Sequence, residues 1–141
     1  MKLQGIRVWK IALALNKAVS TVGTARHAIK VNKRRFGEGL KDILDWLEEH
    51  KEEYGYAFHS APDGNFALNF ADSDSGAQAF SDYLLKTEFT IEPYVFTEEA
   101  FIDINGITEE DEAWLEPLTI ENYKKYLQKT RAEVDDGGDD S

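Results

Sequence analysis

Histidine, serine and aspartate lie close together in one short stretch of the chain, His59-Ser60 followed by Asp63. These are the three residue types of a hydrolytic triad, in which the histidine takes the proton of a serine nucleophile. The stretch alternates apolar and polar residues, which predicts a strand, and neighbouring side chains of a strand point to opposite faces. His59 therefore cannot readily serve Ser60, and the sequence contains no Gly-x-Ser-x-Gly turn. We predict no catalytic residue and no enzyme activity.

A second stretch, Asp72-Ser-Asp74-Ser-Gly76, resembles the opening of a calcium loop. An EF-hand needs glycine at its sixth position and glutamate at its twelfth. Counted from Asp72, the glycine falls at the fifth position and Tyr83 at the twelfth. We therefore predict that these residues cap a helix and that no metal or cofactor is bound. The chain also has no cysteine, which excludes thiolate chemistry and Cys-ligated zinc.

Apolar residues alternate along a third stretch, at Phe66, Leu68 and Phe70. With the helix expected after it, this stretch resembles the third strand and second helix of an RNA-recognition motif, whose strand aromatics stack on bases. The basic residue that opens that motif is missing, and Asn69 lies where the motif has an aliphatic residue. We predict that Phe66, Leu68 and Phe70 belong to the core.

Charge is divided unevenly along the chain. The first 37 residues hold nine Lys or Arg and no Asp or Glu, although the whole protein has a net charge of -11. Residues 42–141 hold 26 acidic and six basic residues, a net charge of -20. Such asymmetry is typical of electrostatic binding to a partner or of association between oppositely charged segments. The candidate residues for binding a partner or nucleic acid are Arg7, Lys10, Lys17, Arg26, Lys30, Lys33, Arg34 and Arg35.

The acidic counterpart lies between Lys86 and Lys124, where eleven Asp or Glu and no Lys or Arg occur. Such a surface keeps a protein soluble, binds a basic partner, or imitates the phosphates of nucleic acid. The predicted acidic surface consists of Glu98, Glu99, Glu109, Glu110, Asp111 and Glu112. Residues 135–141 offer four Asp and no apolar side chain, so we predict a disordered acidic tail.

The basic residues lie on predicted helices. Apolar residues at helical spacing predict a first helix over residues 3–22. Gly23-Thr24 predicts a stop and a new cap, with a second helix over residues 25–36. Gly37-Glu38-Gly39 is predicted to end that helix, and a third helix follows over residues 40–54.

The middle of the chain changes to alternating patterns, which predict strands. Residues 56–60 and 66–70 form a predicted hairpin across the turn at residues 61–64, and a short helix follows. Two further strands are predicted at residues 90–96 and 100–104. The stretch Ile6–Leu13 is an alternative strand, since Ile, Val and Trp also favour sheets. Two C-terminal helices are predicted, which begin with caps at Thr108 and Thr119.

The expected fold is α+β, a single domain over residues 1–134. Helices are expected over residues 1–54, a small antiparallel sheet with one packed helix over 55–105, and C-terminal helices over 106–134. No apolar run approaches the ~20 residues of a membrane span, so we expect a cytoplasmic protein with no membrane partner.

The expected function is non-catalytic. We expect an accessory, assembly or regulatory protein, phage-like in its compactness and charge polarity, that acts through electrostatic contacts with a protein partner or through self-association. The first alternative is a nucleic-acid-binding protein that uses the basic helices and is inhibited by its acidic tail. The second alternative is an acidic inhibitor that mimics DNA.

Overall fold

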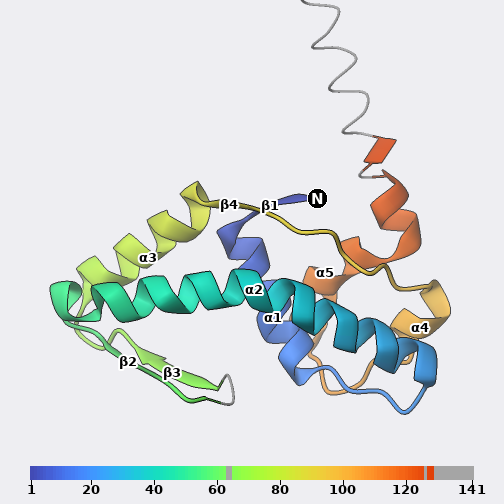
Figure 1. The fold of residues 1–141 in the computed structure, drawn as a ribbon, viewed down its shortest axis with the longest axis horizontal. Coiled ribbons are helices and arrows are strands. Elements are labelled where there is room, and N and C mark those ends of the chain that lie inside the picture. The colour runs from blue at the N-terminus through green and yellow to red at the C-terminus, as the bar shows by residue number, and fades with distance from the viewer. Residues whose placement is uncertain (63–64, 126, 129–141) are drawn as a thin grey trace, which may run out of the picture. The chain divides into compact units, whose positions relative to one another are not determined.

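The computed structural model describes residues 1–62, 65–125 and 127–128. Asp63, the aspartate of the triad pattern that the sequence argues against, and the predicted acidic tail at residues 135–141 lie outside the described residues. The fold is α+β, as the sequence predicts (Figure 1). The elements follow in the order β1 (Lys2–Gln4), α1 (Gly5–Lys17), α2 (Gly23–Tyr54), β2 (Ala57–Ser60), β3 (Phe66–Asn69), α3 (Asp74–Lys86), β4 (Glu88–Thr90), α4 (Glu98–Ile102), α5 (Glu109–Leu115) and the 3-10 helix η1 (Glu116–Leu118). In the described part of the chain, no helix is both long enough and apolar enough to cross a membrane.

The chain forms two compact units. Unit 1 consists of Met1–Ala12 and Arg34–Glu92, and unit 2 consists of Leu13–Lys33 and the described residues from Pro93 onward. The helices α1 and α2 each contribute residues to both units. The single domain over residues 1–134 stays a prediction.

Unit 1 contains two small antiparallel sheets. The predicted hairpin is confirmed as β2 and β3, with Phe58 opposite Leu68. The second sheet pairs β4 with β1, with Leu3 opposite Phe89. The sequence pattern did not reveal β1, because a three-residue strand is too short to show alternation.

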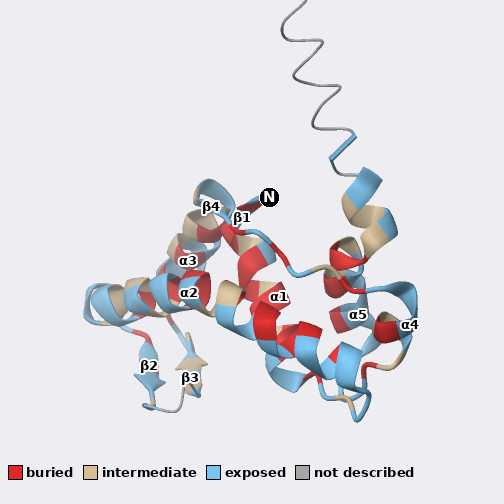
Figure 2. Cartoon of the chain, turned by 45° about the vertical axis from the view of Figure 1, so that its right-hand side comes forward, coloured by how far each residue is buried: buried red, intermediate tan, exposed pale blue. Residues whose placement is uncertain are grey.

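The helix α3 begins as its predicted cap requires. Ser73 is the N-cap residue, and its hydroxyl accepts the backbone N–H of Gly76 at 3.1 Å. The helix places Phe80 in the core, where its ring lies 5.3 Å from that of Trp9. Trp9 also contacts Phe66, with ring centres 5.3 Å apart, but Phe66, Leu68 and Phe70 are each half-buried, so the prediction that they belong to the core is met only in part. Figure 2 shows the buried residues of α1 as a nearly continuous band.

The predicted helix break at Gly37-Glu38-Gly39 is wrong, because α2 runs without interruption from Gly23 to Tyr54. Gly39 is buried, and a Cβ atom at this position would lie only 2.9 Å from Cγ1 of Val8. The glycine therefore lets α2 approach α1 closely within unit 1. Tertiary packing of this kind outweighs the cost of placing glycine inside a helix, which is about 1 kcal/mol relative to alanine.

Two other predicted boundaries and one alternative strand are corrected. The first helix ends at Lys17 and does not continue to residue 22, and the alternative strand at Ile6–Leu13 is wrong because these residues are helical. Of the strand predicted at residues 90–96, only Thr90 lies in a strand, as the last residue of β4. Phe96 forms a single isolated bridge to Thr119.

The predicted strand at 100–104 is wrong, because Glu98–Ile102 form the helix α4. The Thr97 hydroxyl accepts the backbone N–H of Ala100 at 3.1 Å, and two glutamates occupy the first turn. An N-cap and negative charge at this end both stabilise a helix. The apolar residues of this short segment fit both the helical period of 3.6 residues and the strand period of two, so these local interactions decide that it is a helix.

Unit 2 contains the predicted capping box. The Thr108 hydroxyl accepts the backbone N–H of Asp111 at 3.1 Å, and the Asp111 carboxylate accepts the backbone N–H of Thr108 at 3.0 Å. After η1, residues 120–125 and 127–128 are helical, which confirms the second C-terminal helix over its described part.

A fully buried asparagine, Asn32, ties α2 to the chain at Tyr94 in unit 2. Its side-chain amide donates to the carbonyl of Tyr94 at 2.7 Å, and its side-chain oxygen accepts the backbone N–H of Tyr94 at 2.9 Å. The Asn32 side chain thus satisfies the backbone N–H and carbonyl of Tyr94, which in a sheet would bond to a neighbouring strand.

Candidate functional site

The predicted basic residues divide between the two units. Four of them belong to unit 1 and four to unit 2. Those of unit 1 are Arg7, Lys10, Arg34 and Arg35, and those of unit 2 are Lys17, Arg26, Lys30 and Lys33. The two sets are therefore described separately.

Lys17 is paired with an acidic residue of its own unit. Its ammonium group donates to both carboxylate oxygens of Asp111, at 3.0 Å and 3.2 Å. Asp111 is buried, and its pKa is lowered chiefly because its carboxylate accepts the Thr108 backbone N–H, with Lys17 lowering it further. One residue of the predicted basic set and one of the predicted acidic set thus bind each other, and together they anchor α5 to the end of α1.

Arg34 and Arg35 lie among carboxylates. They line a hollow of about 380 Å³ in unit 1 together with Glu38, Asp42 and Glu92. The Arg35 guanidinium also donates to the backbone carbonyl of Glu92 at 3.1 Å. The surroundings of these two arginines are therefore of mixed charge.

Arg26, Lys30 and Lys33 form the basic surface of unit 2. Their spacing of four and three residues places them on one face of α2, and all three are exposed. Within the described residues, none of them forms a salt bridge. They line a hollow of about 270 Å³ whose lining includes Val19 and Ile29 and contains no carboxylate and no aromatic ring.

Val19 presents its side chain from a fixed backbone. Its N–H donates to the Asn105 carbonyl at 2.9 Å, and its own carbonyl accepts the Asn105 N–H at 2.8 Å. The next residue, Ser20, accepts the backbone N–H of Val22 at 3.1 Å, which orders the start of α2. The side chain of Val19 remains exposed, with the residue at 58% of its full accessibility. Sequence reasoning missed Val19, because residue type alone does not distinguish an exposed valine from a buried one.

Gly106 permits the bridge between Val19 and Asn105. Its φ angle is +83°, and a Cβ atom there would lie 2.6 Å from the carbonyl oxygen of Lys17. Only glycine adopts this conformation readily and avoids the collision. The segment between α1 and α2 therefore depends on this residue for its position.

The predicted acidic residues lie at helix N-termini. Glu98 and Glu99 occupy the first turn of α4, and Glu109, Glu110 and Glu112 occupy that of α5. These five are exposed, whereas Asp111 is buried in the capping box. Negative charge at a helix N-terminus is stabilising, so these side chains have a structural role in addition to any contact with a partner.

A second acidic surface lies on the part of α2 that belongs to unit 1. Trp46 stacks on Tyr83 with ring centres 4.9 Å apart. Burial raises the pKa of Tyr83, and the nearby carboxylates of Asp42, Asp45 and Glu49 raise it further. The part of α2 in unit 2 therefore carries cations without carboxylates, whereas the part in unit 1 carries all the carboxylates of this helix together with Arg34, Arg35, Lys41 and Lys51.

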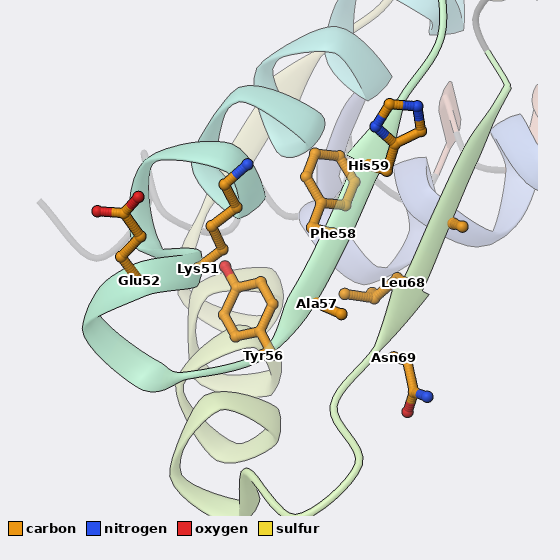
Figure 3. Close-up of a pocket in the computed structure, with 9 residues that line it drawn as sticks. Lys51, Glu52, Tyr56, Ala57, Phe58, His59, Leu68 and Asn69 are labelled. Carbon is orange, nitrogen blue, oxygen red and sulfur yellow. The ribbon is translucent and has the colours of Figure 1, made fainter.

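The hairpin of unit 1 borders a larger hollow of about 520 Å³ (Figure 3). Tyr56, Phe58 and Leu68 supply apolar surface, and Lys51 reaches it from the end of α2. The Tyr56 hydroxyl donates to the Leu47 carbonyl at 2.6 Å, and burial raises the pKa of Tyr56 to about 12. Tyr56 is therefore neutral and already hydrogen-bonded near pH 7, which suits a structural role better than proton transfer.

His59 and Ser60, which the sequence places beside Asp63, are both exposed on β2. Among the described residues, no group of three or more His, Asp or Glu is placed to hold a metal ion. The chain matches no protein-family model, and no similar chain was found among curated proteins or solved structures.

Proposed function

We propose that this protein is a non-catalytic accessory, assembly or regulatory protein of the cytoplasm that binds an acidic protein partner through Arg26, Lys30 and Lys33. One observation carries the proposal. These three cations are exposed on one helix face and have no carboxylate partner among the described residues. Lys17 and Arg35, by contrast, already bind acceptors within their own units.

The surroundings of this basic surface favour a protein partner over nucleic acid. Proteins that bind single strands commonly stack bases on aromatic rings, and the hollow beside the three cations is lined without any. Unit 2 also carries the exposed glutamates of α4 and α5, and the whole chain has a net charge of -11. A long polyanion would meet this repulsion along its length, whereas a short acidic segment interacts within a screening distance of about 8–10 Å.

The test is a pull-down from native lysate, with and without nuclease, using the wild type and two variants of equal charge. The first variant is Arg26→Glu, Lys30→Glu and Lys33→Glu. The matched control reverses three other exposed lysines, Lys41, Lys124 and Lys125. We expect a nuclease-resistant protein partner that the control retains and the first variant loses.

Two results would contradict the proposal. Capture that disappears on nuclease treatment would support the nucleic-acid alternative. Equal loss of the partner in both variants would show that net charge, and not this surface, governs binding.

A further inference from the structure

We infer that the hollow of unit 2 binds a short acidic peptide segment that carries one aliphatic anchor residue, with the anchor against Val19 and the carboxylates on Arg26, Lys30 and Lys33. This inference rests on the proposed function and specifies the chemistry of the partner. It assigns two kinds of contact to one site, because apolar and cationic side chains border the same hollow.

The apolar part of the site is small and fixed. A volume of about 270 Å³ lies below the roughly 300–1,000 Å³ of pockets that enclose a drug-sized ligand. It therefore suits one inserted side chain. Ile29 is almost fully buried and supplies the base of the hollow, whereas Val19 is largely exposed.

The position of Val19 is set before any partner binds. Two backbone hydrogen bonds hold this residue to Asn105. A backbone that is already held in place loses little conformational entropy on association, which favours affinity. An exposed valine on a mobile segment would lack this advantage.

The cations are spaced to match an extended peptide. Arg26 and Lys33 are seven residues apart on α2, and a helix rises about 1.5 Å per residue, so they are separated by about 10 Å along the axis. An extended chain advances about 3.3 Å per residue and its alternate side chains share a face, so same-face side chains two and four positions apart are separated by about 7 and 13 Å. An acidic residue at position i, an aliphatic residue at i+2 and a second acidic residue at i+4 therefore lie on one face, and the long side chains of Arg26 and Lys33 can extend to the two carboxylates.

The partner that this geometry favours is a peptide and not a nucleic acid. An apolar side chain fills the hollow without leaving a polar group unpaired. A phosphate would bind the three cations as a carboxylate does, but it would leave the apolar side chain of Val19 uncovered, and a base would find no aromatic ring in the lining for stacking.

The experiment measures fluorescence anisotropy of a labelled synthetic peptide in which one leucine is flanked on each side by two glutamates. A second peptide has serine in place of the leucine, and a single-stranded oligonucleotide of equal charge is the third probe. We expect the full-length protein to bind the leucine peptide about tenfold more tightly than the serine peptide, a difference of ~1.4 kcal/mol. Binding should also weaken as the salt concentration rises.

Protein variants separate the two kinds of contact. The variant with Arg26, Lys30 and Lys33 changed to Glu should lose binding of the leucine peptide, and the control with Lys41, Lys124 and Lys125 changed to Glu should retain it within about twofold. Val19→Ser should weaken binding about as much as the leucine-to-serine change in the peptide. Val19→Ile, which keeps the apolar surface, should retain it. If Val19→Ser were to unfold, the serine peptide would test the same contact on the intact protein.

Equal binding of the two peptides, or no binding of either, would overturn this inference while a nuclease-resistant partner in the pull-down would still support the proposed function. Tighter binding of the oligonucleotide than of the leucine peptide would also overturn it and would favour the nucleic-acid alternative.

Discussion

Replacing Gly37 and Gly39 by alanine, one at a time, tests both the continuity of α2 and its close approach to α1. A glycine in a helix interior is about 0.8–1.0 kcal/mol less favourable than alanine. No atom lies within 4 Å of the position that a Cβ of residue 37 would take. Gly37→Ala should therefore raise the free energy of unfolding by about 1 kcal/mol, because the added methyl group meets nothing.

At Gly39 the same gain is opposed by a collision. The new Cβ would lie 2.9 Å from Cγ1 of Val8, which is fully buried. A valine in a helix has essentially one rotamer, so it cannot turn aside without moving the backbone. Overpacking of this kind costs about 1–3 kcal/mol. Gly39→Ala should therefore be neutral or destabilising by up to about 2 kcal/mol, and the two variants should differ by about 1–3 kcal/mol.

Urea denaturation followed by circular dichroism at 222 nm measures both free energies under identical conditions. Equal stabilisation by the two substitutions would refute the close approach at Gly39. Destabilisation by Gly37→Ala would refute a continuous α2, because a glycine that ends a helix in the left-handed conformation resists replacement by alanine.

Three further substitutions probe polar groups in the two units. Asn32→Ala should lower the free energy of unfolding by about 1–3 kcal/mol, measured by urea denaturation, because it leaves the backbone N–H and carbonyl of Tyr94 without partners. The lowered pKa of Asp111 means that its stabilising effect is complete above its ordinary pKa, near 4, and is lost as pH falls through the lowered value. In an acid titration of unfolding, the advantage of the wild type over Asp111→Asn should therefore shrink below about pH 4. Burial raises the pKa of Tyr56 from 10.0 to about 12, so its stabilising effect is complete below pH 10 and is lost between pH 10 and 12. In an alkaline titration of unfolding, the free energy of unfolding of Tyr56→Phe should therefore fall less between pH 10 and 12 than that of the wild type.

The interactions that the sequence predicted correctly are local ones. The Ser73 cap and the capping box at Thr108 and Asp111 join residues three positions apart, so residue type and spacing are sufficient to indicate them. The β2–β3 hairpin is also local, because a short turn connects its strands. Such contacts leave a pattern that can be recognised without knowledge of the fold.

The helix break at Gly37 to Gly39 was predicted wrongly because the deciding contact is distant in sequence. Glycine propensity argues for a break, and only the packing of Gly39 against Val8 shows why a glycine is favourable within this helix. The strand β1 was missed for a similar reason, since it exists through its pairing with β4, more than 80 residues later.

The sequence by itself determined the α+β class and the opposition between basic and acidic segments, because composition and periodicity record them directly. It could not determine which cations already have partners. Only the tertiary structure brings Lys17 to Asp111, and only the bridge to Asn105 leaves Val19 beside Arg26 on an exposed surface. The physical reason is that charge is a property of each residue, whereas its neutralisation depends on which distant residues the folded backbone places within a few ångströms of it.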